Sequence, residues 1–145
     1  MKNSQDYNSP CFYFHLRRAT RAVGQVYEKY FRPTGLRSGQ FAMLATIRQL
    51  ERLSIGELGT VMGMDQTTTT RNVELLSRKG LVNLQADSGD ARRKTLALTP
   101  AGRAKLQKAE PRWRQAQAEL TANLGLMEAE RLMEMLELLV KAVKK

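Results

Sequence analysis

The residues from 66 to 71 have the chemistry of a surface that contacts DNA bases. A glutamine amide can pair with adenine, a threonine can donate to phosphate or touch a thymine methyl group, and an arginine can bind a guanine edge or a phosphate. The candidate contacts are Gln66, Thr67, Thr68, Thr70 and Arg71. A run of threonines is unfavourable in a helix, because β-branched side chains lose rotamer freedom there. Residues that are unfavourable in a helix therefore occur where bases could be contacted, which favours a role in DNA binding. The alternative is an ordinary solvated helix face.

A second charged group comprises Asp90, Arg92, Arg93 and Lys94. Asp90 and Arg92 are separated by one residue in a tight turn, so we expect the carboxylate to hold the guanidinium in one bidentate orientation. A guanidinium directed outward suits the narrow minor groove of an A-tract, because it is planar and weakly hydrated. Arg93 and Lys94 would then lie along phosphates. The alternative is a charged loop that only increases solubility.

The sequence around the first group predicts two short helices joined by a turn. Residues 54–57 form an S-x-x-E capping box that begins a helix at Ile55, and Gly63 ends this helix. Asp65 can cap a second helix, which ends near Gly80. The inward stripe of the second helix would consist of Thr69, Val73 and Leu76. This stripe leaves the candidate base contacts on the outside, and the pair of helices is a helix-turn-helix.

The sequence around the second group predicts a β-hairpin. Residues 81–86 and 94–99 alternate in polarity, and residues 87–90 between them are rich in turn formers. The residues expected on one face of this hairpin are Val82, Leu84, Leu96 and Leu98. The charged group would therefore lie at the tip of a hairpin that follows the helix-turn-helix.

This order of elements resembles the winged helix-turn-helix of the MarR family of bacterial transcription regulators. The matching motifs are Thr68-x-Thr70-Arg71, Gly80-Leu81-Val82, Asp90-x-Arg92 and Leu98-Thr99-x-x-Gly102. One position departs from the family pattern, since Leu84 stands where an arginine is common.

The resemblance implies one domain over residues 1–145, mainly α-helical with a small β-hairpin wing. Dimerisation helices over residues 10–35 and 100–145 would flank a DNA-binding lobe over residues 38–99. It also implies a homodimer, in which the first and last helices of two copies interleave.

Helical patterns in the terminal regions agree with this division. A long amphipathic helix is expected over residues 10–32, ended by Pro33 and Gly35, and Ser38 can cap the next helix. Near the C-terminus, Thr99-Pro100 is typical of an N-cap followed by proline at the first helical position. Two amphipathic helices are expected there, one to about residue 124 and one after Gly125.

The apolar stripes of these terminal helices exceed what a compact winged-helix core can cover. A second copy of the chain is the simplest partner for them. A monomer that folds its own helices into a bundle is the alternative.

Composition restricts the class of protein. The chain has 24 Lys and Arg against 14 Asp and Glu, a formal net charge of +10, which favours a polyanionic partner. One cysteine and one histidine exclude an intramolecular disulfide and a structural zinc site. We find no apolar run long enough to span a membrane, and expect a cytoplasmic, nucleoid-associated protein of bacterial or archaeal origin. Without paired carboxylates, a nucleophile with a base, or a phosphate-binding loop, the sequence predicts neither an enzyme nor a cofactor.

The family resemblance also suggests an effector, because family members often bind small aromatic acids between the dimerisation helices and the DNA-binding lobe. Candidate residues for an aromatic or carboxylate effector are Tyr13, His15, Arg18 and Phe41. His15 could equally be an ordinary packed or solvent-facing helix residue.

Cys11 raises a redox hypothesis, since one branch of the family senses organic peroxides with a cysteine at the start of the first helix. In that branch a tyrosine lies near the start of the second helix, where this chain has Ser38. A structural cysteine is the alternative.

These inferences predict a homodimeric, sequence-specific regulator of transcription. It would be a repressor that binds an inverted repeat in double-stranded DNA and is released by a small-molecule effector. The alternatives are a redox-sensing regulator that acts through Cys11 and an architectural protein that coats DNA by charge alone.

Overall fold

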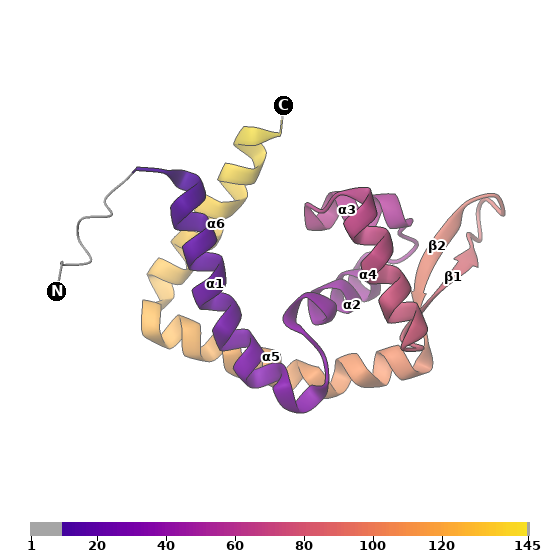
Figure 1. Ribbon diagram of the computed structural model, residues 1–145, viewed down its shortest axis with the longest axis horizontal. Coiled ribbons are helices and arrows are strands. Elements are labelled where there is room, and N and C mark those ends of the chain that lie inside the picture. Colours follow the sequence, from indigo (N-terminus) through magenta and orange to yellow (C-terminus); the bar gives the residue numbers. More distant parts are fainter. Residues whose placement is uncertain (1–9, 145) are drawn as a thin grey trace.

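The computed structural model describes residues 10–144, which form a mainly helical chain with one antiparallel hairpin (Figure 1). The elements are α1 (Phe12–Phe31), the short 3-10 helix η1 (Arg32–Thr34), α2 (Ser38–Gln49), α3 (Ile55–Met62), α4 (Gln66–Arg78), β1 (Val82–Ala86), β2 (Lys94–Leu98), α5 (Pro100–Leu124) and α6 (Leu126–Val143). The predicted fold class, a winged helix-turn-helix with long terminal helices, is confirmed. Figure 1 shows α2, α3, α4 and the hairpin on one side, α1 and α6 on the other, and α5 below both groups.

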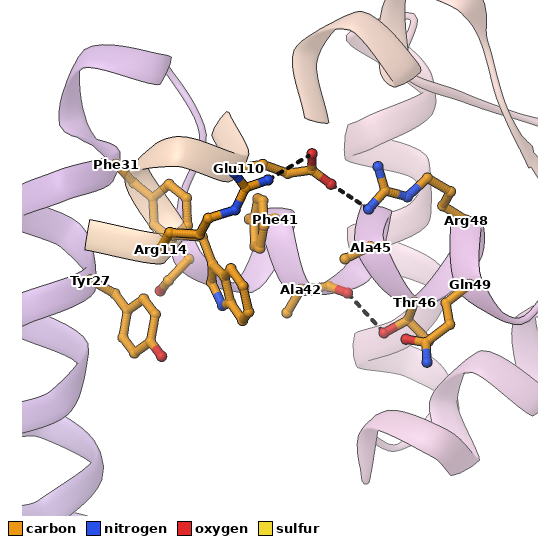
Figure 2. Close-up of a pocket in the computed structure, with 13 residues that line it drawn as sticks. Tyr27, Phe31, Phe41, Ala42, Ala45, Thr46, Arg48, Gln49, Glu110 and Arg114 are labelled. Carbon is orange, nitrogen blue, oxygen red and sulfur yellow. Dashed lines mark hydrogen bonds and ion pairs between the residues drawn. The ribbon is translucent and has the colours of Figure 1, made fainter. Parts of the chain in front are cut away.

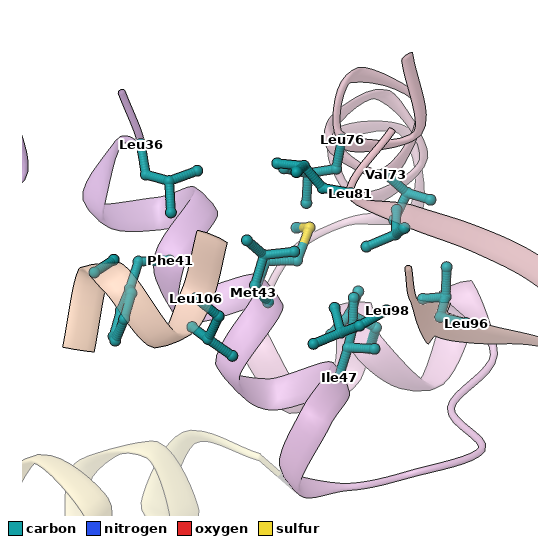
Figure 3. Close-up of a cluster of buried hydrophobic side chains, with 14 of the residues drawn as sticks. Leu36, Phe41, Met43, Ile47, Val73, Leu76, Leu81, Leu96, Leu98 and Leu106 are labelled. Atoms are coloured by element: carbon teal, nitrogen blue, oxygen red, sulfur yellow. The ribbon is translucent and has the colours of Figure 1, made fainter. Parts of the chain in front are cut away.

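The hydrophobic core lies in the lobe that contains α2, α3, α4 and the hairpin (Figure 3). Helix α2 contributes four buried side chains, and α4, the hairpin and α5 close around them. The α2 residues are Phe41, Met43, Leu44 and Ile47. Burial of one such side chain contributes about 1.5–3 kcal/mol. This core therefore fixes α4 relative to the hairpin.

Both helix caps of the helix-turn-helix form as predicted. Ser54 Oγ accepts from the amide of Glu57 at 3.2 Å, and the Glu57 carboxylate accepts from the Ser54 amide at 2.8 Å. Gly63 ends α3 with a left-handed φ of 66°, which glycine adopts without strain. Asp65 Oδ1 then accepts from the amide of Thr68 at 2.7 Å and caps α4.

Two details of the first two helices differ from the prediction. Helix α1 begins at Phe12 rather than at residue 10, and Arg37 rather than Ser38 is the N-cap of α2. The prediction for Ser38 is wrong because its hydroxyl and amide both donate to Glu28, at 2.9 and 3.1 Å. Ser38 therefore joins α2 to α1 instead of capping its own helix.

The hairpin pairs Val82 with Leu98 and Leu84 with Leu96, so the predicted face is confirmed. The ladder is slightly shorter than expected, since β1 begins at Val82 and β2 ends at Leu98. Leu84 remains 48% exposed, whereas Leu96, its partner in the ladder, is only 3% exposed. The amide of Leu96 donates to the carbonyl of Leu53 at 2.7 Å, which joins β2 to the segment before α3.

Helix α6 has no buried residue within the chain. Most of its apolar side chains are exposed, including Leu126 at 65% and Met127 at 70%. This arrangement contradicts a single-chain bundle, in which the apolar side of α6 would be covered. None of the helices within residues 10–144 is long and apolar enough to cross a bilayer.

Candidate nucleic-acid interface

The exposed side of α4 carries the predicted base contacts. Gln66, Thr67, Thr68 and Arg71 are exposed, and Thr70 is half-buried. Thr69 is fully buried, and its hydroxyl donates to the carbonyl of Asp65 at 2.7 Å. The structure thus separates one inward threonine from its neighbours, as the predicted stripe requires. The role of the exposed residues in DNA binding stays a prediction.

Close packing of α3 against α4 sets the position of this exposed side. A Cβ added at Gly59 would lie 2.7 Å from Thr69 Oγ1 and 3.2 Å from the carbonyl oxygen of Met64. Because Thr69 belongs to α4 and Met64 to the turn between the helices, a larger residue at position 59 would push the two helices apart. Gly59 therefore fixes the angle at which α4 projects from the lobe.

Asp65 gives the start of α4 a stable negative charge. The hydrogen bond from the backbone amide of Thr68 lowers the pKa of the Asp65 carboxyl, and the positive charge of Arg71 lowers it further. A carboxylate at this position also interacts favourably with the helix dipole. The first turn of α4, which carries the candidate contacts, is therefore held by an ionised cap at neutral pH.

The expected bidentate pair between Asp90 and Arg92 is not formed. Asp90 Oδ1 instead accepts from the backbone amide of Arg92 at 3.0 Å, and the amide of Arg93 donates to the carbonyl of Asp90 at 3.0 Å. A short carboxylate in a tight turn reaches the amide two residues further on more easily than a long side chain. Asp90 consequently shapes the loop, and the exposed side chain of Arg92 lies at its tip.

Arg93 and Lys94 differ in their surroundings. The Arg93 guanidinium forms an ion pair with Glu57 and donates to the carbonyl of Arg52 at 3.0 Å. Lys94 is exposed at the start of β2. Contact of either residue with phosphate stays a prediction.

Sequence reasoning missed the bidentate pair that the hairpin does contain. Arg52 Nε and Nη2 donate to the two carboxylate oxygens of Asp87, at 2.7 and 2.8 Å. These residues lie far apart in the sequence, so no local motif indicated the pair. The sequence patterns placed Asp87 only among turn formers and assigned no role to Arg52.

A crevice of about 820 Å³ lies between α1, α2 and α5 (Figure 2). Aromatic rings form one wall: Phe41 lies 4.9 Å from Phe31 and 6.2 Å from Trp113, measured between ring centroids. Glu110 at the rim forms an ion pair with Arg48 and lies 3.8 Å from Arg114. The crevice therefore combines an apolar wall with two arginines around one carboxylate.

Only one of the four candidate effector residues lines this crevice. Phe41 belongs to its aromatic wall, whereas Tyr13, His15 and Arg18 lie in the first half of α1, outside the lining. The four residues are therefore not brought together within one chain. The crevice also contains Trp113, the single tryptophan of the sequence, which was not among the predicted effector residues although its large ring could have indicated a binding site.

Cys11 lies at the N-cap of α1, where it is exposed and forms no disulfide. Its proposed redox role stays a prediction. Among residues 10–144, no group of three His, Cys, Asp or Glu side chains is placed to hold a metal ion.

Two capped helices joined by a left-handed glycine, followed by a basic hairpin, define a winged helix-turn-helix protein. Residues 36–94 match the MarR family. The chain is 41% identical to the transcriptional regulator MosR of M. tuberculosis, solved in complex with DNA, with a TM-score of 0.78 over 93% of this chain and 99% of that one. A probable transcriptional regulator from Pseudomonas aeruginosa is 31% identical, with a TM-score of 0.80 over 90% and 97% of the two chains.

A third relative is the putative transcriptional regulatory protein for the hcr operon of Thauera aromatica. It is 32% identical over 90 residues, which are 61% of this chain and 54% of that protein, so the chain spans about half of its length. The chain belongs to the MarR family. It is a DNA-binding regulator of transcription and not an enzyme.

Proposed function

We propose that this protein is a homodimeric repressor that binds an inverted repeat in double-stranded DNA and releases it when a small molecule binds. The observation that carries the proposal is the exposed first half of α4, whose polar residues are held outward by the buried Thr69. This half-helix would enter the major groove, while Arg92 at the hairpin tip would reach the adjacent minor groove. The protein would act on the chromosome in a bacterial or archaeal cytoplasm.

The exposed apolar side of α6 supports the proposed dimer. Large apolar side chains are exposed on this helix and at the start of α1, and a partner would cover them. A two-fold contact through these helices would place the two α4 helices on one side of the assembly. Half-sites about 34–36 Å apart would then be contacted together.

The crevice between α1, α2 and α5 is the proposed effector site. An aromatic carboxylate suits it, because the ring can stack on Phe41 or Trp113 and the carboxylate can replace Glu110 beside Arg48 or Arg114. Helix α2 lines the crevice and also supplies much of the core under α4. A ligand that prefers one position of α2 would therefore shift the population toward a different spacing of the α4 helices.

Selection of bound fragments from random DNA tests the regulatory function. We expect the selected fragments to share an inverted repeat. In fluorescence anisotropy, binding to this site should be at least a thousandfold tighter than binding to scrambled DNA of the same composition. Equal affinity for the two DNAs would contradict sequence-specific regulation and support an architectural protein instead.

Fluorescence of Trp113 tests the effector site. Benzoate should change the emission of this single tryptophan and lower the affinity for the selected DNA, whereas neutral benzamide should have a weaker effect. An Arg48→Gln variant should lose much of this difference between the two compounds. If neither compound changes the emission or the DNA affinity, the proposed class of effector is wrong.

A further inference from the structure

Arg52 has an unusual backbone conformation. Within residues 10–144 it is the one residue other than glycine with a positive φ, at 64°. Side chains with a Cβ are strained in this region, and glycine adopts it freely. Such a conformation persists only where the surrounding structure enforces it, and the strained residue often has a function. The contacts of the Arg52 side chain should therefore explain why an arginine occupies this position.

These contacts fix the outer end of the hairpin. The guanidinium donates to both oxygens of Asp87, whose side chain is only 4% exposed. A planar guanidinium that makes two parallel bonds restrains direction as well as distance. This interaction also lowers the pKa of the Asp87 carboxyl. Since Asp87 directly follows β1, the pair holds the point where the loop leaves the ladder.

The loop is shaped to accept the guanidinium. A Cβ added at Gly89 would lie 2.9 Å from Arg52 Nη2, so a larger residue there would displace the arginine. On the other side of the loop, the Arg93 guanidinium donates to the carbonyl of Arg52 and pairs with Glu57 of α3. The two strands of the hairpin are thus both joined to the segment between α2 and α3.

This cluster lies next to the exposed arginine of the wing. Arg92 is adjacent to Arg93, and its amide is held by Asp90. Its own guanidinium has no ion pair among the described residues. The direction in which Arg92 leaves the lobe therefore depends on the loop between residues 87 and 93, and this loop is oriented by Arg52.

We infer that Arg52 is a positioning residue for DNA binding, which orients the hairpin tip through Asp87 so that Arg92 reaches the minor groove while α4 lies in the major groove. Arg93 supports the same orientation through Glu57. This inference rests on the proposed function and adds a residue that contacts no DNA itself. Arg52 would contribute to affinity only through Arg92.

A double-mutant cycle between positions 52 and 92 tests the inference. Arg52→Gly removes the side chain and suits the left-handed backbone, so the fold should be retained. We expect this variant to bind A-tract-flanked DNA about tenfold more weakly, which corresponds to the loss of one oriented charge-assisted contact. In an Arg92→Ala background, the same change should cost little further affinity. Arg78→Ala, which removes an exposed charge elsewhere on the lobe, should combine additively with Arg92→Ala.

Two other variants separate orientation from charge. Arg52→Lys keeps the charge but not the two-pronged contact, and should give an intermediate loss. Asp87→Asn should resemble Arg52→Gly while leaving Arg52 in place. If Arg52 instead contacts phosphate directly, Arg52→Gly will weaken DNA binding just as much in the Arg92→Ala background. The salt dependence of binding will also decrease. These two results together would overturn the inference.

Hydrogen exchange tests the orientation of the hairpin without DNA. The amide of Asp87 donates to the carbonyl of Arg93, and the amide of Arg93 donates to the carbonyl of Asp90. Both amides should exchange faster in Arg52→Gly, while the amides of α4 should not change. Unchanged exchange at both loop amides would overturn the inference even if the wild-type protein binds its operator. Faster exchange with no DNA binding by the wild type would instead count against the proposed function.

Discussion

Gly102 packs directly against the backbone of Leu81. A Cβ added at Gly102 would overlap the carbonyl oxygen of Leu81 and lie 2.9 Å from its carbonyl carbon. That oxygen also accepts from the amide of Thr99 at 3.1 Å, and the Thr99 hydroxyl donates to the carbonyl of Gly80 at 2.6 Å. The start of α5 is thereby fixed to the base of the hairpin by backbone contacts.

Replacement of Gly102 by alanine should destabilise the protein strongly. The added methyl group meets backbone atoms that cannot rotate away, so we expect a loss of about 3 kcal/mol, at the upper end of typical overpacking costs. Urea unfolding followed by circular dichroism measures this loss. Gly56→Ala is the matched control, since a Cβ there meets only Ser54 Oγ at 3.9 Å, and a gain of about 0.5–1 kcal/mol is expected. Equal stability of the two variants would contradict the close packing of Gly102.

Arg71 should contribute to base preference as well as to affinity. If its guanidinium contacts a base edge, Arg71→Ala should cost about 1–3 kcal/mol on the selected site and relax the preference at one symmetric pair of positions. Arg78→Ala removes the same charge near the other end of α4 and should leave base preference unchanged. Fluorescence anisotropy on a set of single-base operator variants distinguishes the two. If Arg71→Ala weakens binding equally on all operator variants, Arg71 contacts phosphate instead of a base edge.

The proposed dimer should depend on Leu132 and Leu136. Both side chains are partly exposed within one chain, at 46% and 36%, and would be buried by a partner. Truncation of a buried leucine to alanine costs about 2–5 kcal/mol. The double alanine variant should therefore dissociate at concentrations where the wild type remains dimeric by light scattering. A wild type that is monomeric at micromolar concentration would refute the proposed assembly.

The Asp65 cap predicts a specific dependence of stability on pH. The pKa of Asp65 is lowered in the folded protein from its ordinary value of 3.8, mainly by the Thr68 amide. Because the pKa of the Asp65 carboxyl is lower in the folded than in the unfolded protein, its ionised form stabilises the fold at pH values above the ordinary pKa. This stabilisation is lost as the pH falls through the pKa of the folded state. Asp65→Asn keeps a capping oxygen but does not titrate.

Comparison of the wild type with Asp65→Asn isolates this effect, because the other carboxyl groups titrate in both proteins. The wild type should be the more stable at pH 7, and its advantage should disappear as pH falls below about 4. Urea unfolding at several pH values provides the comparison. A difference in stability that does not change with pH would show that the charge of Asp65 contributes nothing to folding.

Sequence patterns identified the elements whose determinants are local. The side chains of Ser54, Asp65 and Thr99 each accept from the amide three residues further on, so the caps could be recognised without knowledge of the fold. The alternating polarity of β1 and β2 could also be recognised, because successive side chains of a strand point to opposite faces of the hairpin. Ser38 was misassigned because its partner, Glu28, comes from another helix.

The parts that could not be predicted depend on long-range contacts. Asp87 is joined to Arg52 and Arg93 to Glu57, across separations that no spacing rule covers. Asp90 was paired with the wrong group of Arg92, since sequence alone does not tell whether a turn carboxylate will meet an amide or a guanidinium. The crevice proposed as the effector site was predicted only in part, because its aromatic wall is assembled from three helices.

The exposed apolar side of α6 makes the stability of the proposed dimer depend on protein concentration. Because no residue of this helix is buried within its own chain, the apolar contacts that would stabilise it come from the partner of the proposed dimer. Stability of such a protein rises with its concentration, and a melting temperature has meaning only at a stated concentration. On dilution, dissociation would expose α6, and the freed chains would become substrates for proteases. When synthesis of the protein decreases, its cellular abundance and its regulatory activity would therefore both decrease by more than the decrease in synthesis.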